Sequence, residues 1–362
     1  MKRIAIIGLG AAAHYIHLPA YRECSRRARV VAGCDSDPAA RTRMTGTVPE
    51  LFEDPRAMLE KHRPDVVAVC TPPWLHREHA LLGLEHGCHV FCEKPFAESL
   101  EQVDEIIAAA ERASRTVAVN NQFPYLRIHR AAKEAIGTTG FGRLLYLHAW
   151  QTMAATEFTE AGWRARMERR LCYEFGVHVF ELVRYFFDDT PLRLQAHMPS
   201  AIGPVKGELV DVVSMEFADG RAASMVLDRL NRGHERYLDL RLDGEHATIQ
   251  TSIGGRLQLR AGLETRERRP FVAFDYALGG RAMLERGQRS RTLAREGLTP
   301  FTSATAYHFE RFLDALDSGA LPPGHARDNR KTLALVLAAY DSAQSGRMVE
   351  MSAYRAPSAE PR

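Results

Sequence analysis

The chain has 362 residues, of which 45% are hydrophobic and 26% are charged, and its net charge is +3. This composition is typical of a globular protein of about two domains, and it excludes a disordered, collagen-like or disulfide-stapled chain. The 48 basic residues nearly balance the 45 acidic ones, so we expect no nucleic-acid partner. No apolar run reaches the ~18 residues of a membrane span, and we expect a cytoplasmic protein without a membrane partner.

The six cysteines are spread along the chain, and several lie inside apolar runs, which is typical of buried free thiols. Cys88 and Cys92 are four residues apart, but no second pair at zinc-ligand spacing accompanies them. We therefore expect no metal site.

Short runs rich in β-branched residues alternate with helical stretches over the first 120 residues. The helix expected at Leu100–Ala113 begins with a capping box, because Gln102 follows Ser99 by three residues. This alternation predicts βαβ units and a parallel sheet, and we assign residues 1–123 to a first, α/β domain. The expected strands are Ile4–Ile7, Val30–Ala32, Val66–Val69, His89–Phe91 and Thr116–Val119.

The pattern changes after about residue 125, where a helix near Ile128–Ile136 and a strand at Leu144–Gln151 precede a longer helix at Cys172–Phe187. Asp219-Gly220 and Asp243-Gly244 separate later strands, which favours hairpins and an open, mostly antiparallel sheet. The further expected strands are Leu192–Met198, Val210–Phe217, Ala222–Leu227, Leu238–Leu242, Ala247–Gln250 and Leu257–Leu259.

The segment Glu264–Glu296 contains eight arginines and little periodicity, so we expect a loop or excursion there. Two helices, about Tyr307–Ser318 and Asn329–Ser345, follow it. We assign residues 124–350 to a second, α+β domain that binds substrate and forms oligomers, and we expect residues 351–362 to be a tail, disordered after Ala356.

A glycine-rich turn follows the first expected strand, with the pattern Gly8-Leu9-Gly10-Ala11-Ala12-Ala13. This is the G-x-G-x-x-A fingerprint of a Rossmann domain, in which the first glycine makes the turn and the second lets the backbone approach a pyrophosphate. Asp35 ends the second strand, where its carboxylate would accept hydrogen bonds from a ribose hydroxyl and repel a 2′-phosphate. We expect NAD as the cofactor, and NADP stays open because Ser36 and Arg41 are close by.

Polar residues also follow the later strands. Thr71-Pro72 comes after the strand Val66–Val69, and Glu93-Lys94-Pro95 comes after the strand His89–Phe91. Ligands of open parallel sheets bind outside the carboxyl ends of the strands, so Thr71, Lys94 and the segment Asn120–Gln122 are expected to line a cofactor crevice. Lys94 is one of only six lysines, and its compact ammonium differs chemically from the arginines that this chain otherwise prefers.

Glu174, His178 and Glu181 have the spacing i, i+4, i+7 within an otherwise apolar helical segment. On a regular helix these side chains share one face, which predicts a site built of two carboxylates and an imidazole.

Three motifs together resemble the Gfo/Idh/MocA oxidoreductase family: the glycine-rich turn, Glu93-Lys94-Pro95 and the acid-x-Gly-x-His element that ends at His178. Trp163-Arg164 fits the same resemblance, which covers residues 3–350. The resemblance implies a Rossmann domain followed by an α/β domain whose open sheet commonly forms the oligomer interface. It further implies hydride transfer between NAD(P) and a carbinol or carbonyl carbon of a sugar, cyclitol or related polyol.

The resemblance assigns catalytic roles to Lys94, His178 and Glu174, where Glu174 replaces the family's usual aspartate. His178 would move the hydroxyl proton and Lys94 would stabilise the reacting oxygen. The expected partners are a sugar or polyol substrate and further copies of the chain, as a dimer or tetramer. The expected cofactor-binding residues are Gly8, Gly10, Ala11, Ala12, Asp35, Ser36, Thr71, Pro72, His76, Glu93, Lys94, Gln122, Trp163 and Arg164.

Two other functions stay open at this point. One is a redox-neutral glycosidase that oxidises and re-reduces its sugar with bound NAD, and the other is a non-catalytic sensor of NAD or a sugar.

Overall fold

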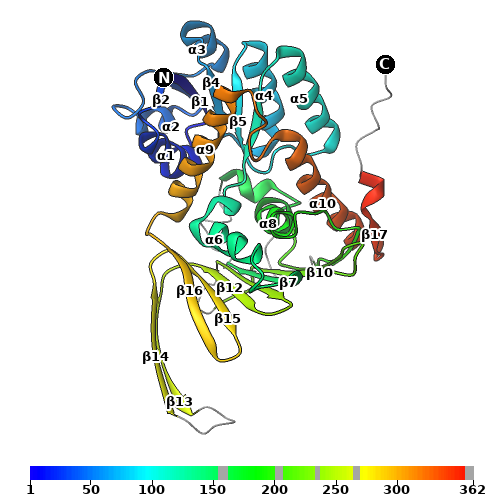
Figure 1. Cartoon of the computed structure of the whole chain (residues 1–362). Coiled ribbons are helices and arrows are strands. Elements are labelled where there is room, and N and C mark those ends of the chain that lie inside the picture. Colours follow the sequence, from blue (N-terminus) through cyan, green and yellow to red (C-terminus); the bar gives the residue numbers. More distant parts are fainter. Residues whose placement is uncertain (154–161, 200–206, 233–236, 264–269, 355–362) are drawn as a thin grey trace.

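Figure 1 shows the chain as a computed structural model that describes residues 1–153, 162–199, 207–232, 237–263 and 270–354. A six-stranded sheet occupies the upper half of the view and a nine-stranded sheet the lower half, with helices around the first and above the second. The expected fold class, a Rossmann domain followed by a domain with an open, mostly antiparallel sheet, is confirmed.

The first sheet is entirely parallel and has the strand order β3-β2-β1-β4-β5-β6. This is the order of a doubly wound dinucleotide-binding sheet, in which the ligand crevice opens where the strand order reverses, beside β1 and β4. The strands are β1 (Lys2–Ile7), β2 (Ala28–Cys34), β3 (Leu51–Phe52), β4 (Val66–Val69), β5 (His89–Glu93) and β6 (Val117–Asn120). The two-residue strand β3 was not expected from the sequence.

Helix starts in this half follow from capping side chains. Ser99 Oγ accepts a hydrogen bond from the Gln102 amide at 3.3 Å, and the Gln102 side chain accepts one from the Glu98 amide at 3.0 Å. The expected helix Leu100–Ala113 is thereby confirmed at both ends. The helices and helical turns are η1 (Ala13–His17), α1 (Leu18–Glu23), α2 (Pro38–Arg43), α3 (Pro55–His62), η2 (Pro73–Leu75), α4 (His76–Glu85), α5 (Leu100–Ala113) and η3 (Phe123–Tyr125).

The second sheet has the order β16-β15-β12-β11-β7-β10-β9-β8-β17. Neighbouring strands are antiparallel except for β7 and β10, which are parallel. Its strands are β7 (Leu144–Thr152), β8 (Arg193–His197), β9 (Val210–Glu216), β10 (Ala222–Asp228), β11 (Leu238–Gly244), β12 (Thr248–Ile253), β15 (Gly280–Arg286), β16 (Arg289–Glu296) and β17 (Val349–Glu350).

Helices cover one face of this second sheet. They are α6 (Arg127–Ile136), α8 (Val177–Phe187) and α10 (Ala326–Ser345), and in Figure 1 α6 and α8 lie between the two sheets. Alternate residues of the strands, such as Leu147, Val213 and Met225, are fully buried beneath these helices. Burying them removes apolar surface from water and fixes α8 at the boundary between the two sheets.

Helix α9 (Pro300–Ser318) returns to the first sheet. The Phe309 and Phe312 rings lie 5.2 and 5.4 Å from the ring of Phe91 in β5, and Arg27 forms an ion pair with Asp314. The helix begins seven residues before the expected Tyr307. The division of the chain at residue 123 stays a prediction.

The expectation of a loop or excursion at Glu264–Glu296 is wrong in its loop form for residues 270–296, most of which form strands, and residues 264–269 lie outside the described part. Strand β13 (Arg256–Leu263) pairs with β14 (Pro270–Ala277) in a hairpin that extends below the rest of the molecule, and β15 and β16 form the edge of the second sheet. In β16 arginine alternates with small residues, as in Arg289-Ser290-Arg291-Thr292. An edge strand exposed to water tolerates these arginines. Because they are charged, the alternation of residues typical of a strand could not be recognised from hydrophobicity.

The first residues of the expected tail are ordered, because Met351–Tyr354 form the helical turn η6. Met351 is buried, and the Tyr354 carbonyl accepts a hydrogen bond from Arg330 Nη1 at 2.9 Å. Residues 355–362 lie outside the described part. No helix among the described residues has the length and apolar character needed to cross a membrane.

Candidate active site

A cavity of about 660 Å³ opens at the carboxyl ends of the first sheet and extends to the start of α8. It brings together all the expected catalytic and cofactor-binding residues except His76. Asn120, Asn121 and Glu181, which were also expected at the site, do not line it. The first sheet contributes the loops after β1, β2, β4, β5 and β6, which is where a doubly wound fold binds its ligand. The expected residues that line the cavity are Gly8, Gly10, Ala11, Ala12, Asp35, Ser36, Thr71, Pro72, Glu93, Lys94, Gln122, Trp163, Arg164, Glu174 and His178.

The glycine-rich turn has two glycines with different roles. Gly8 has a φ of +92°, and a Cβ there would lie 2.7 Å from the Cys70 carbonyl carbon, so only glycine fits. A Cβ at Gly10 would meet no described atom within 4 Å, because Gly10 borders the open cavity. Gly8 therefore closes the turn against the loop after β4, and Gly10 leaves room for a ligand to approach the backbone.

Asp35 is held by the backbone around it. Its Oδ2 accepts a hydrogen bond from the Leu9 amide at 2.7 Å, and its Oδ1 accepts one from the Asp37 amide at 2.9 Å. A carboxylate has about four acceptor sites, so Asp35 keeps acceptor capacity for the hydroxyls of a ribose. These residues fit a dinucleotide with an unmodified ribose.

Arg41 is engaged elsewhere. Its Nη1 donates to the backbone carbonyls of Asp35 and Ser36 at 2.7 and 3.0 Å, and its Nη2 lies 3.4 Å from Glu53 Oε2. A guanidinium with these contacts is not directed at a 2′-phosphate, which favours NAD over NADP.

Glu93 lies in the cavity wall but is bound by the protein itself. Its Oε1 accepts hydrogen bonds from His17 Nε2 at 2.6 Å and from Asn120 Nδ2 at 2.7 Å. Burial alone would lower the pKa of His17, but its contacts with Cys70 and Glu93 raise that pKa to about 10. The pKa of Glu93 is lowered because the contacts with His17 outweigh its burial. Glu93 thus forms a buried ion pair that links η1 to β5.

Lys94 follows Glu93 and extends toward α8. Its Nζ donates a hydrogen bond to the backbone carbonyl of Glu174 at 2.9 Å and lies 5.7 Å from the centre of the Phe175 ring. Burial lowers the pKa of the Lys94 ammonium, and the negative charges of Glu174 and Glu93 oppose that shift. A cation therefore lies between the two sheets at the inner end of the cavity.

His178 lies in the first turn of α8 and is almost fully buried. Its ring stacks on Phe123 at a centroid distance of 3.9 Å and an interplanar angle of 4°. Its Nδ1 lies 2.5 Å from Asn121 Oδ1. Burial, and then the charge of Lys94, hold the pKa of His178 well below its ordinary value of 6.5, so the imidazole is neutral near pH 7.

Glu174 lies in η5 (Leu171–Gly176), a π-helical turn that precedes α8. Its Oε1 accepts a hydrogen bond from Arg164 Nε at 2.6 Å. Its buried Oε2 lies 3.9 Å from Arg170 Nε, in an ion pair, and accepts no hydrogen bond from the described residues. The Arg164 guanidinium lies 4.3 Å from the centre of the Trp163 ring, in the helical turn η4 (Gly162–Arg166). The cavity wall therefore contains a buried carboxylate oxygen, Glu174 Oε2, beside an arginine whose charge Glu174 balances.

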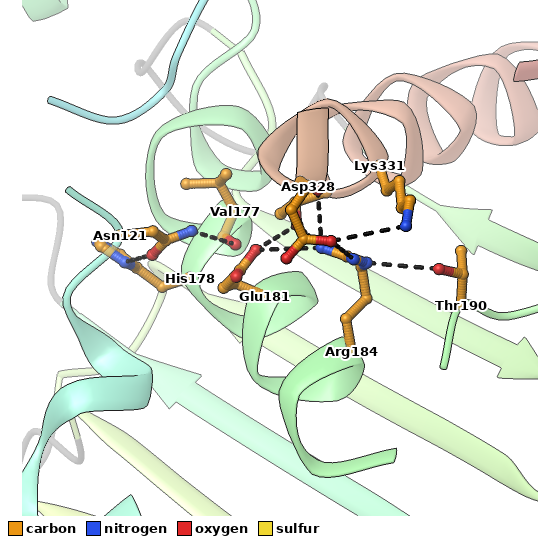
Figure 2. A network of polar contacts seen from close by, with 9 residues as sticks. Asn121, Val177, His178, Glu181, Arg184, Thr190, Asp328 and Lys331 are labelled. Carbon is orange, nitrogen blue, oxygen red and sulfur yellow. Dashed lines mark hydrogen bonds and ion pairs between the residues drawn. The ribbon is translucent and has the colours of Figure 1, made fainter. Parts of the chain in front are cut away.

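The expectation that Glu181 shares a face with Glu174 and His178 is wrong. Figure 2 shows Glu181 turned toward Arg184 and away from the contact of His178 with Asn121. Glu181 accepts a hydrogen bond from Thr332 Oγ1 and lines a separate cavity of about 470 Å³. Glu181 follows His178 by three residues within the regular helix α8, so its carboxylate lies about one turn farther along, beside Arg184 and Thr332 of α10.

His76 does not line the cavity. Its Nδ1 lies 2.7 Å from the Pro95 carbonyl oxygen, and its Nε2 lies 2.7 Å from the Thr71 carbonyl oxygen. His76 therefore connects the loops after β4 and β5 without facing the cavity. His79, one helical turn later, lines the cavity and contacts Thr71 Oγ1 at 3.1 Å. The lining residues that sequence reasoning missed are Ile7, Tyr15, Ile16, Cys34, Glu53, Pro55, Cys70, Pro73, Leu75, His79, Phe175, Tyr237 and Phe301.

The parallel sheet, the glycine-rich turn and the cation–imidazole pair define an NAD-binding oxidoreductase of the Rossmann type. Residues 2–121 match the model of the oxidoreductase family with an NAD-binding Rossmann fold, and residues 129–250 match the GFO/IDH/MocA C-terminal domain. The chain belongs to the Gfo/Idh/MocA oxidoreductase family.

Several known proteins are similar over much of the chain. A D-apiose dehydrogenase of Paraburkholderia graminis is 28% identical over 97% of this chain and 90% of its own length. A D-glucoside 3-dehydrogenase of Escherichia coli is 30% identical over 56% of this chain and 59% of its own length. An oxidoreductase from Agrobacterium radiobacter, solved with NAD⁺, L-tartaric acid and magnesium, has a TM-score of 0.81 at 21% identity, covering 97% of this chain and 99% of that one.

Proposed function

We propose that this chain oxidises a CH–OH carbon of a sugar, cyclitol or related polyol and passes the hydride to NAD. The observation that carries the proposal is the meeting of Lys94 and neutral His178 in the cavity that also contains Gly10 and Asp35. The similarity to a D-apiose dehydrogenase and a D-glucoside 3-dehydrogenase supports a polyhydroxylated substrate.

His178 acts as the base in this proposal. A neutral imidazole accepts the hydroxyl proton as the carbinol carbon is oxidised, and its lowered pKa keeps it neutral at physiological pH. NAD, when bound, supplies the nicotinamide carbon that accepts the hydride. Lys94 donates to the same substrate oxygen and stabilises the negative charge that develops on it.

Two buried acceptors would orient the rest of the substrate. Among the described residues, no hydrogen-bond donor is recorded for Gln122 Oε1 or for Glu174 Oε2, and both residues line the cavity. A buried acceptor without a hydrogen bond costs about 1–3 kcal/mol, so each favours a ligand that brings a hydroxyl donor. At Glu174 Oε2 the charge of Arg170, 3.9 Å away, offsets part of that cost. Neighbouring hydroxyls of a polyol meet this requirement.

Replacing His178 with alanine tests the proposed base. We expect kcat for the oxidation of the responding substrate to fall by about 100-fold or more, with nearly unchanged NADH affinity, because the ring acts on the substrate proton. Initial rates of NADH formation over a panel of aldoses, glycosides, cyclitols and branched sugars measure the first quantity, and fluorescence titration measures the second. His246→Ala, at an exposed turn, is the matched control. Unchanged turnover in His178→Ala contradicts the assignment.

The open face of the second sheet supports a proposal about assembly. Trp150, Val226 and Val212 are neighbours across β7, β10 and β9, and Trp150 and Val212 are 41% and 45% exposed. An apolar row on a sheet face that no described helix covers is typical of a subunit interface. We infer a homo-oligomer, a dimer or tetramer, that buries this row.

Val212→Asp tests the assembly. We expect a buried carboxylate to dissociate the oligomer, so that sedimentation velocity shows a monomer where the wild-type chain shows a larger species. Leu321→Asp, at a leucine that is 75% exposed elsewhere, is the control and should sediment like the wild type. A monomeric wild type, or a Val212→Asp variant of unchanged mass, contradicts the proposal.

A further inference from the structure

Asn121 lies in the loop between β6 and η3, directly beside His178. Its Oδ1 is 2.5 Å from His178 Nδ1, and both side chains are almost fully buried. On the basis of the proposed role of His178 as the base, we propose that Asn121 is a positioning residue that selects the Nδ1–H tautomer of His178. This tautomer leaves the lone pair on Nε2, the nitrogen that takes the substrate proton.

The orientation of the Asn121 amide is set by a second contact. Its Nδ2 donates to the backbone carbonyl of Val177 at 3.3 Å, as Figure 2 shows. A carbonyl oxygen only accepts hydrogen bonds, so the amide nitrogen must point to Val177 and the amide oxygen to His178. The alternative amide orientation would set two acceptors against each other at Val177.

The amide orientation then determines the imidazole. An acceptor 2.5 Å from Nδ1 requires a proton on Nδ1. A neutral imidazole carries a single N–H, so Nε2 is left unprotonated and basic. The opposite tautomer would place two lone pairs against each other and present an N–H to the substrate, which cannot remove a proton.

The ring plane is fixed independently of the tautomer. Phe123 stacks flat on the His178 ring and comes from the same segment as Asn121. Farther along α8, Arg184 donates to the Asp328 carboxylate at 2.6 Å, as Figure 2 shows. It also donates to Thr332 Oγ1 at 2.9 Å, and both bonds tie α8 to α10. Phe123 and these ties hold the ring in place, and Asn121 decides which nitrogen carries the proton.

The tautomer itself is measurable in the wild-type protein. ¹⁵N-histidine NMR, with His178→Ala used to assign the signal, should show a protonated Nδ1 and an unprotonated Nε2 near neutral pH. A protonated Nε2 overturns the proposal. This measurement does not depend on turnover, so it can fail while the proposed oxidation holds, and the reverse is also true.

Two replacements of Asn121 separate positioning from a structural tie. Asn121→Leu removes the acceptor, and we expect kcat to fall by about 10- to 100-fold with little change in KM and with a mixture of tautomers in the spectrum. Asn121→Asp keeps an acceptor for Nδ1–H but loses the donor to Val177, and we expect it to retain kcat within about 10-fold of wild type.

The pair of variants gives a clear decision. Thermal unfolding and NADH titration establish that each variant is folded and binds cofactor. The proposal is overturned if Asn121→Leu keeps full kcat, or if Asn121→Asp loses as much as Asn121→Leu, because the tie to Val177 would then be what matters. If Asn121→Leu fails to fold, the wild-type spectrum and Asn121→Asp still decide.

Discussion

At the scale of single residues, the glycine-rich turn needs Gly8 for its backbone conformation and Gly10 for the approach of the cofactor. Gly8 has a left-handed backbone and lies against the Cys70 backbone, whereas Gly10 borders open space. The first glycine therefore serves the fold and the second serves ligand approach. The motif in the sequence already predicted this division, and the structure adds the contact with Cys70 that makes glycine necessary at position 8.

Alanine at each position should produce a different defect. We expect Gly8→Ala to lose about 1–3 kcal/mol of stability, because the Cβ meets backbone atoms in a strained conformation. Gly10→Ala should unfold like the wild type and lose NADH affinity, because its Cβ enters the space that the cofactor needs. Chemical denaturation and NADH titration measure the two effects. A stable Gly8→Ala variant, or full NADH affinity in Gly10→Ala, would contradict this division.

Residue-level prediction succeeded where chemistry depends on local spacing. Asp35, Lys94 and the loop residue Gln122 follow strands of one parallel sheet, so their meeting at one edge follows from topology. Tyr237, the residue directly before β11, and Phe301 of α9 also line the cavity. No local sequence pattern predicts that an aromatic residue at either position lies in the site. Glu181 was misassigned because its contacts with Arg184 and Thr332 depend on the packing of α8 against α10, which sequence spacing does not show.

At the scale of elements, the ion pair of His17 and Glu93 joins η1 to β5 and, through Asn120, to β6. The raised pKa of His17 means that its contribution to stability is fully present below its ordinary value of 6.5 and is lost as the pH rises through about 10. The lowered pKa of Glu93 means that its contribution is present above 4.5 and is lost on acidification.

This linkage predicts how stability depends on pH. Between about pH 7 and about pH 10, the free energy of unfolding of the wild type should fall more steeply than that of Glu93→Gln, in which His17 has lost its carboxylate partner and keeps the contact with Cys70. Urea denaturation at several pH values measures the difference. Glu50→Gln, which removes an exposed contact with His62, should keep the wild-type steepness. Equal steepness in the wild type and Glu93→Gln would show that the pair does not titrate in this range.

Element prediction was accurate where the sequence contains an explicit signal. The capping box defined α5, and the β-branched run Val66–Val69 matched β4 at both ends. The helix α9 began earlier than expected, because Pro300 starts it without a capping hydrogen bond from Thr299. The arginine-rich strands β15 and β16 form a local hairpin around Gly287 and Gln288, but they escaped prediction because edge strands tolerate charges that conceal alternation.

At the scale of the whole molecule, the active cavity is assembled from both sheets. The first sheet contributes the cofactor turn and Lys94, and the helical layer of the second sheet contributes Glu174 and His178. Helix α9 closes the arrangement by returning to the first sheet, where Phe309 and Phe312 pack against Phe91. The proposed hydride transfer therefore depends on cofactor-binding residues and on Glu174 and His178, which meet only in the folded chain.

The most direct test of the oxidation follows a label from the substrate to the cofactor. The wild-type protein is incubated with NAD and a responding sugar or polyol that is deuterated at its carbinol carbon. We predict that the deuterium appears at the nicotinamide carbon of released NADH, with a carbonyl product formed in equal amount. The account would be contradicted if the sugar were converted without net NADH and its product carried the deuterium again. It would also be contradicted if the chain bound the sugar and NAD without converting either.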